Sequence, residues 1–362
     1  MTALDLARLR LRQQSLDRPR FKTPSDVVSW FGAVQAQDYP AAKWSLGLRI
    51  PGATDASIEK TFDDGTILRT HVMRPTWHFV PPENIRWMQA LTAGRVRARL
   101  APYDRKLEIT EKLRSRCTSL LEKALRGNRH LTRAELAQAL ARGRIEARGP
   151  RLGHIVMHAE LDGLVCSGPR RGKEFTYALL EERAPRTKTI DRGEALARLA
   201  LSYFESHGPA QVKDFAWWSG LTAKDAAAGL DSVKEQLERV IVDGKTYWLT
   251  PTRVRASPAK TPAAHLLSIY DEYVIAYKDR GALGGAMYIE KFLMMGNALT
   301  AVVTIDGQIV GTWKRTIGKG AVDVVVSPLR KLTRAESKAI DAAANRYGKF
   351  LGLPATTSSS AA

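Results

Sequence analysis

Two glutamines separated by one alanine, Gln35 and Gln37, are the residues of this chain whose spacing points most directly to chemistry. Asp38 and Pro40 follow closely. On an α-helix, residues at positions i and i+2 point in nearly opposite directions, whereas in an extended segment they point to the same side. The pattern predicts a helix over residues 24–34, and Pro40 disfavours helical geometry just before it. We therefore expect both carboxamides to lie where a helix ends, aimed at one spot that could hold a water molecule.

The chemistry open to such a pair is limited, because an amide has no useful pKa and cannot act as a general base. It can accept a hydrogen bond from water and donate another elsewhere. A fixed water is sufficient where the leaving group is already activated, as in the loss of an N7-alkylated purine, which leaves an oxocarbenium-like sugar for water to trap at C1′. Positioning alone supplies at most about 7–11 kcal/mol of such a barrier. The alternative is that the glutamines only cap their own backbone at a helix end.

Asp38 is the carboxylate nearest to the pair in the sequence. As the direct neighbour of Gln37 it should point away from the two amides, so we assign it at most a supporting role.

Composition favours a polyanionic partner. The 362 residues include 56 Lys and Arg against 37 Asp and Glu, a formal net charge of +19, which points to nucleic acid before a membrane surface. An Arg-rich composition would exchange Lys for Arg without leaving this excess. The length predicts two to four modules, and an apolar fraction of 44% is enough to build their cores.

The two cysteines, Cys117 and Cys166, do not form a CxxC pair, which excludes a disulfide framework or a zinc ribbon. The first residues carry charges among their leucines instead of a signal-peptide core, and no segment reaches bilayer-spanning length. We therefore expect a cytoplasmic protein, associated with the bacterial nucleoid and not with a membrane.

The kind of module that holds the glutamines is easiest to predict from a later segment, residues 187–255, where the same pattern is clearest. Helices are predicted over 194–206 and 211–218, and Thr222 caps a third that runs to Leu237. The pair Asp243-Gly244 between two apolar runs then indicates a hairpin. Three helices followed by a hairpin are typical of a winged helix.

The same order recurs in residues 106–186, with helices over 115–125 and 152–161 and another capped by Thr132. The tip of the hairpin that follows holds three cations suited to phosphate contact, although a solvated polar loop is the ordinary alternative. These cations are Arg170, Arg171 and Lys173.

Residues 1–105 fit the scheme more loosely. A hairpin over 67–80 follows the glutamine motif, and we expect Arg69, His71 and Arg74 in it to approach DNA. Strand alternation equally allows this face of the hairpin to pack inside the protein. The predicted fold is therefore α+β and mainly α. Its parts are three tandem winged-helix modules at 1–105, 106–186 and 187–255, a β-rich C-terminal domain at 256–352 and a disordered tail at 353–362.

Other polar groupings have weaker claims to chemistry. The signatures GxSxG, GxGxxG, HExxH and the Walker A loop are missing. His154 and His158 have a spacing that could hold a metal, but they lie in a predicted helix where packing or DNA contact is preferred.

Asp271 and Glu272 are adjacent, and adjacent carboxylates diverge. We expect a charged edge or a salt bridge to Lys278 or Arg280.

Four segments in this order resemble the AlkZ/YcaQ family of winged-helix DNA glycosylases, over nearly the whole chain from about Leu4 to Leu351. They are Gln35-Ala36-Gln37-Asp38, His71 to Phe79, Asp271 to Arg280, and Asp306 to Trp313.

The resemblance implies a C-shaped protein that hydrolyses N-alkylated purine nucleosides at N7 or N3, interstrand crosslinks included. The family's catalytic signature falls on Gln35 and Gln37, in the form found in the branch linked to self-resistance against DNA-alkylating natural products. We find no distinct lysine nucleophile, so a monofunctional enzyme is expected. It should act on damaged double-stranded DNA as a monomer and need no metal or organic cofactor.

Two non-enzymatic alternatives fit the composition and the repeats equally well. A winged-helix transcription regulator would bind one operator, as a dimer on a palindrome, and release no base. A nucleoid-packing protein would bind DNA without either operator preference or product.

Overall fold

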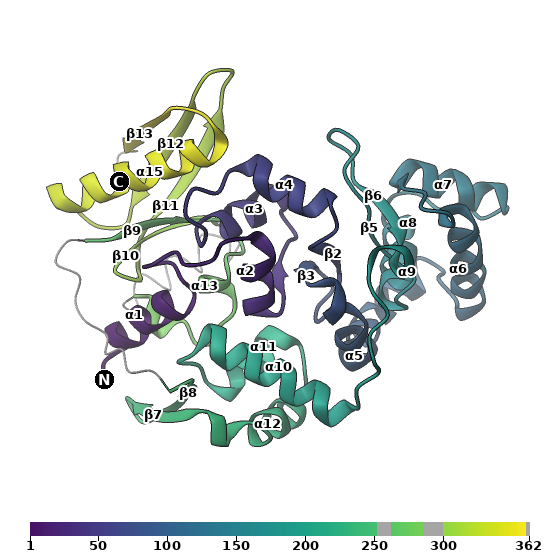
Figure 1. The fold of residues 1–362 in the computed structure, drawn as a ribbon, viewed down its shortest axis with the longest axis horizontal. Helices are drawn as coiled ribbons and strands as arrows, with labels where there is room; N and C mark the ends of the chain where they lie inside the picture. The colour runs from purple at the N-terminus through teal and green to yellow at the C-terminus, as the bar shows by residue number, and fades with distance from the viewer. Residues whose placement is uncertain (252–261, 285–299, 360–362) are drawn as a thin grey trace.

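Capped helices alternate with short antiparallel strands along most of this chain (Figure 1). The structure is a computed structural model that describes residues 1–251, 262–284 and 300–359. The fold is α+β and mainly helical, as predicted. None of the described helices combines the length and apolar character needed to cross a membrane.

The first segment, residues 1–106, contains a small three-stranded sheet in the order β1-β3-β2, with helices packed around it. Several of its helices begin at capping boxes, for example Thr23 with Asp26, because those side chains satisfy otherwise unpaired N–H groups. The elements are α1 (Ala3–Gln13), α2 (Pro24–Phe31), β1 (Val34–Gln35), α3 (Tyr39–Gly47), α4 (Asp55–Asp63), β2 (Leu68–His71), β3 (Trp77–Val80), a 3-10 turn (Pro82–Asn84) and α5 (Ile85–Lys106).

One local prediction in this segment is wrong and another holds in part. The helix expected over 24–34 ends at Phe31, because Gly32 adopts a positive φ of 76° that stops it. Ahead of Pro40 the chain is extended at Asp38, as expected, but Tyr39 is already the first residue of α3, with Pro40 in its first turn, where a missing N–H costs nothing. Asp38 caps that helix, with its side chain accepting from Ala41 N at 2.9 Å.

The second segment has a core of its own and a sheet in the order β4-β6-β5. Thr132 and Glu135 form the predicted capping box at the start of α7. The elements are α6 (Glu111–Leu125), β4 (Leu131–Thr132), α7 (Arg133–Arg142), α8 (Gly149–Leu161), β5 (Val165–Ser167), β6 (Thr176–Leu179) and α9 (Leu180–Arg183).

The third segment is three helices and a hairpin at the bottom of Figure 1. The helix capped by Thr222 ends at Asp231, earlier than predicted, and a 3-10 turn fills the gap before the hairpin. The elements are α10 (Arg192–His207), α11 (Val212–Ser219), α12 (Ala223–Asp231), the turn Lys234–Gln236, β7 (Glu238–Val242) and β8 (Lys245–Leu249).

The C-terminal part forms a five-stranded sheet in the order β13-β12-β11-β10-β9. The tail is not disordered as far as it is described, because β13 pairs in parallel with β12 and so completes the sheet edge. Residues 360–362 and the predicted boundary at 255/256 lie outside the described residues. The elements are β9 (Ala264–Leu267), α13 (Glu272–Ile275), a 3-10 turn (Gly281–Leu283), β10 (Val302–Ile305), β11 (Gln308–Ile317), β12 (Val322–Pro328), α15 (Arg334–Leu351) and β13 (Ala355–Ser359).

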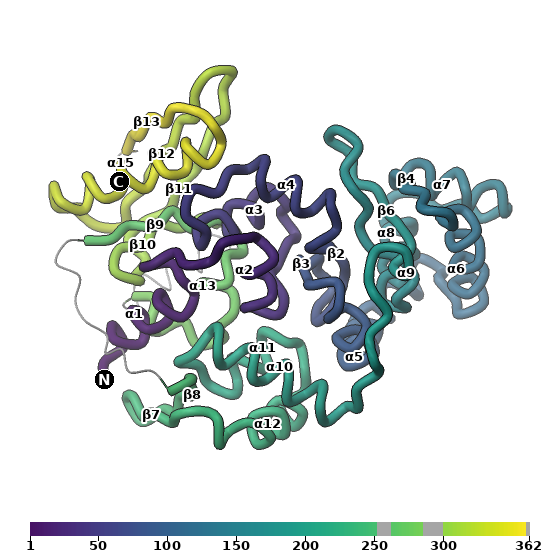
Figure 2. Tube along the Cα trace, in the orientation of Figure 1, coloured from purple at the N-terminus to yellow at the C-terminus, as the bar shows by residue number. Residues whose placement is uncertain are grey.

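The first segment shares one hydrophobic core with the C-terminal sheet. Trp44 on α3 packs against Tyr347 and Phe350 on α15, with ring centroids 4.9 and 5.1 Å apart, and donates its Nε1–H to Leu266 O at 2.7 Å. Figure 2 shows α3 of the first segment beside α15 and the C-terminal sheet. Residues 1–105 therefore depend on distant sequence for their core, and the division into three winged-helix modules stays a prediction.

Candidate active site

The Gln35–Gln37 motif is held between a strand and a helix cap. Gln35 lies on β1 opposite His78 of β3, and the next N–H, that of Ala36, donates to Trp77 O at 2.7 Å. Gln37 lies in the bend that follows, directly before the cap of α3. Strand pairing on one side and the cap on the other thus fix the backbone of a motif that has little regular structure of its own.

Both carboxamides turn toward the loop that joins β2 to β3. Arg74 Nη2 donates to Gln35 Oε1 at 2.8 Å, and Trp77 N donates to Gln37 Oε1 at 3.3 Å. Gln35 is 6% exposed, whereas Gln37 is open to solvent. Among the residues the structure describes, neither amide nitrogen has a hydrogen-bond partner. Each amide oxygen also keeps a second lone pair, so the pair retains the donors and acceptors needed to orient a water molecule.

Arg74 brings a positive charge to this site. Burial lowers the pKa of its guanidinium, and the negative charge of Glu272 acts in the opposite direction. Of the three hairpin residues expected to approach DNA, Arg74 is the one that bonds to a glutamine side chain of the motif among the described contacts.

Arg69 supports the motif from inside the protein and does not face DNA as expected. Its guanidinium lies 4.3 Å from the ring centroid of Trp77 and 4.7 Å from that of Phe175, and its Nε donates to Ala36 O at 2.9 Å. Burial lowers the pKa of Arg69 to about 10, which leaves it charged at neutral pH. It therefore ties the glutamine motif to both hairpins that flank it.

His71 is also buried, which corrects the expectation that it faces DNA. Its Nδ1 makes a close hydrogen bond with Glu160 of α8, and Glu160 Oε1 accepts from Trp77 Nε1 at 3.3 Å. His78 is buried beside Gln35, and burial together with Arg74 holds its pKa well below the ordinary value. Glu160 was not predicted as a site residue, since only the fold brings it to the first hairpin.

Asp271 and Glu272 do not form a charged edge, and neither bonds to Lys278 or Arg280 in the described contacts. Asp271 is buried against Arg49, with both oxygens 2.9 Å from guanidinium nitrogens. Glu272 turns the other way, and its Oε1 accepts from Gln35 N at 2.8 Å. The prediction that the two side chains diverge holds, but the burial of both was missed.

The three cations of the second hairpin have different surroundings. Arg170 lies over the rings of Tyr39 and Phe175, and its backbone N–H donates to Asp63 at 2.7 Å, so it fastens this hairpin to α4. The side chain of Arg171 is 54% exposed and pairs with Glu135. Lys173 is exposed. Arg171 and Lys173 are therefore open to a phosphate, whereas Arg170 is mainly structural.

The histidine pair of α8 has a packing role. His154 Nδ1 and His158 Nε2 lie 3.0 and 2.9 Å from the two oxygens of Asp104 on α5. No cluster of three or more potential ligands that could hold a metal ion occurs within residues 1–251, 262–284 and 300–359.

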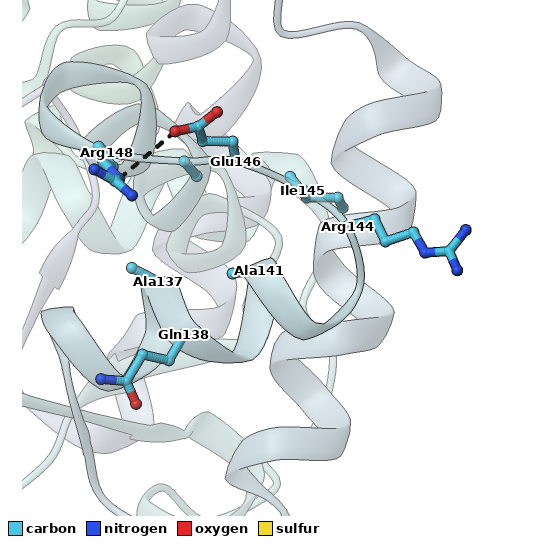
Figure 3. Close-up of a pocket in the computed structure, with 8 residues that line it drawn as sticks. Ala137, Gln138, Ala141, Arg144, Ile145, Glu146 and Arg148 are labelled. Atoms are coloured by element: carbon cyan, nitrogen blue, oxygen red, sulfur yellow. Dashed lines mark ion pairs between the residues drawn. The ribbon is translucent and has the colours of Figure 1, made fainter.

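A pocket of about 500 Å³ lies elsewhere, between α7 and the connection to α8 (Figure 3). Three small or uncharged side chains of α7 form one wall, and Arg148 pairs with Glu146 on the other while Arg144 points away. None of its lining residues contacts the glutamine motif, so we do not assign the chemistry to it.

Comparison with known proteins identifies the class of protein to which this fold and site belong. The fold matches Streptomyces sahachiroi DNA glycosylase AlkZ with a TM-score of 0.82, over 99% of this chain and 100% of that chain, at 24% sequence identity. A family model described as DNA glycosylase AlkZ-like matches residues 28–350. The fold, the amide pair beside a cation and this match together define a DNA glycosylase. The chain belongs to the AlkZ-like family.

A curated relative supports the same family assignment. An interstrand DNA cross-link repair glycosylase of Streptomyces sahachiroi is 24% identical over 366 residues, which covers 95% of this chain and 95% of that protein. The family resemblance predicted from the sequence is therefore confirmed. The chain is an enzyme, a hydrolase of N-glycosyl bonds in DNA, and the alternative of a transcription regulator is set aside.

Proposed function

We propose that this glycosylase releases N-alkylated purines, substituted at N7 or N3, by simple hydrolysis. The observation that carries the proposal is the pair of carboxamides on one loop, each with its oxygen anchored and its nitrogen unpartnered among the described residues. Such a pair can orient water, but it cannot protonate a leaving group. The substrate must therefore carry its own activation, as an alkylated, cationic purine does.

Water is the nucleophile in this proposal, and Gln35 and Gln37 direct it to C1′ of the deoxyribose. The base departs as a neutral alkylpurine, the sugar gains a hydroxyl group, and one proton passes to solvent. The enzyme is monofunctional in this scheme, because no lysine of residues 1–251, 262–284 and 300–359 takes part in the contacts of the glutamine motif. Asp38 supports the motif as the cap of α3.

The name of the curated relative adds interstrand crosslinks to the substrates considered. A crosslink joined through purine N7 presents the same activated glycosidic bond as a methyl adduct. We infer that the enzyme works on double-stranded DNA, as a monomer, at the nucleoid in the cytoplasm.

One assay tests the proposed reaction. Duplex DNA containing N7-methylguanine is incubated with the protein. The products are then split into two portions, and only one portion is treated with alkali. Free N7-methylguanine, with strand breaks only after alkali, is the expected result. Intact duplex would refute the proposal, and breaks without alkali would show a lyase instead.

Removing the two exposed cations of the second hairpin should weaken DNA binding for all sequences alike. Each phosphate contact contributes about 0.9 to the slope of log K against log salt concentration, so the Arg171→Ala/Lys173→Ala variant should flatten that slope by up to about 2. Titration of a fluorescent duplex at several salt concentrations measures it. Arg170→Ala is the matched control: because its side chain is 15% exposed, the salt slope should stay unchanged. An unchanged slope in the double variant would remove this hairpin from the DNA interface.

A further inference from the structure

Glu272 is a fully buried carboxylate in contact with the glutamine motif. Its Oε1 accepts from Gln35 N at 2.8 Å, and its Oε2 accepts from Trp218 Nε1 at 2.9 Å. His207 Nε2 lies 3.3 Å from the same Oε2. One side chain at the start of α13 thus joins β1, α11 and α10.

Each carboxyl oxygen of Glu272 accepts a hydrogen bond from a group that can only donate, the backbone N–H of Gln35 at Oε1 and the indole N–H of Trp218 at Oε2. Burying a carboxylate is costly unless it is paired and hydrogen-bonded. A carboxamide here would turn its NH2 group toward one of the two donors, so a carboxylate is the side chain that satisfies both contacts.

The charge of Glu272 is coupled to Arg74, the cation of the site. The negative charge favours the protonated guanidinium against the effect of burial. Arg74 in turn donates to Gln35 Oε1 at 2.8 Å. Gln35 is therefore held at both ends, by Glu272 at its backbone nitrogen and by Arg74 at its amide oxygen.

We propose that Glu272 is a positioning residue for base excision: it fixes Gln35 through the backbone and supplies a negative charge behind the sugar as its positive charge develops. This inference rests on the proposed role of Gln35. Charges that are already fixed where the transition state needs them stabilise it without reorganisation. Arg74 alone would oppose a developing cation, and Glu272 offsets that effect.

The substitution Glu272→Gln tests the proposal, because it keeps the shape and removes the charge. The new NH2 group would also face a donor, Gln35 N–H or Trp218 Nε1–H, so the alignment of Gln35 is disturbed. With duplex containing N7-methylguanine, we expect the single-turnover rate at saturating enzyme to fall about 100-fold, the effect of a misplacement of about 1 Å. The dissociation constant for duplex carrying an abasic site should stay within about twofold, because Glu272 does not face solvent.

The neighbouring Asp271→Asn variant is the matched control. Asp271 is equally buried on the same segment, but its partners are Ser45, Arg49 and Tyr273. It should lower the unfolding midpoint and leave the rate per folded enzyme within about threefold, since it contacts no residue of the glutamine motif.

A double substitution separates positioning from general stability. If Glu272 acts through Gln35, the Gln35→Ala/Glu272→Gln variant should be no slower than Gln35→Ala alone, because residues that act as a unit are not additive. Additive losses would show that Glu272 does not act through Gln35 and would overturn its assignment as a positioning residue. If Glu272→Gln does not fold, Trp218→Phe takes its place in the same cycle, since it removes one donor to Glu272 and keeps an aromatic ring.

The outcomes distinguish this inference from the proposed function. If Glu272→Gln releases base at the wild-type rate while Gln35→Ala is inactive, the inference about Glu272 is wrong and the proposed function stands. Wild-type rate in Gln35→Ala overturns the proposed role of the glutamine motif, and the inference with it.

Discussion

Replacing Gln35 or Gln37 by alanine should abolish base release and leave DNA binding in place. Each change removes one of the two groups proposed to orient water, and loss of positioning of this kind costs about 100-fold or more in rate, about 2.7 kcal/mol of barrier. Single-turnover release of N7-methylguanine measures the loss. Binding of duplex with an abasic site should change little, because Arg171 and Lys173, the cations proposed to contact DNA, are untouched.

The two glutamines should also act as one unit. The Gln35→Ala/Gln37→Ala variant is then expected to be little slower than either single variant, because a water held by one amide alone is no longer aimed. Gln138→Ala is the control, since Gln138 is an exposed glutamine on α7 with no contact to the motif. Release at the wild-type rate from either single variant would mean that the catalytic water is held elsewhere.

The second large effect concerns stability. Arg49 and Asp271 form an ion pair with side-chain exposures of 1% and 0%, and Arg49 also donates to Gln14 Oε1 at 2.9 Å. Arg49→Met leaves a buried carboxylate without its cation, and breaking a buried pair in this way costs about 3–5 kcal/mol. Urea denaturation followed by tryptophan fluorescence should show a correspondingly lower free energy of unfolding.

A surface pair provides the comparison for this measurement. Lys60 and Asp64 pair on α4 with side-chain exposures of 75% and 50%, so Lys60→Ala should cost less than about 0.5 kcal/mol. If Arg49→Met cost no more than this, the buried pair would not be what holds the first segment to the C-terminal part.

The same pair gives a pH dependence with a definite sign. Burial alone would raise the pKa of Asp271, but Arg49 and Ser45 outweigh it and the pKa is lowered. A lowered folded-state pKa contributes stability that is present above the unfolded value and lost as pH falls through the folded value. The wild-type protein should therefore lose part of its stability in acid, and Arg49→Met should show less of that loss.

Local sequence signals predicted much of the fold correctly. The helix caps at Thr132 and Thr222 and the Asp243-Gly244 hairpin are present where they were expected, because each depends on side chains within a few residues. The errors are also local. Gly32 ended a helix early through its positive φ, and Tyr39, directly before Pro40, is helical where helical geometry was expected to be disfavoured.

The edges of the C-terminal sheet were not predictable in this way. The strand β9 was missed, and residues 355–359 were taken for a disordered tail although they form β13. Both strands gain their backbone hydrogen bonds from strands far away in the sequence, so their own residues carry little signal.

The sequence by itself determined the family, the amide pair and the cationic character of this protein, since residue types, their order and net charge do not depend on folding. Only the tertiary structure decided which side chains serve that pair. Glu272 reaches Gln35 across 237 positions, and Glu160 reaches His71 across 89. It also turned Arg69 and His71 inward, where they had been expected to face DNA. The reason is physical: whether a charged side chain meets solvent or a buried partner depends on which distant segments pack against it, and a pattern read over neighbouring residues contains no such information.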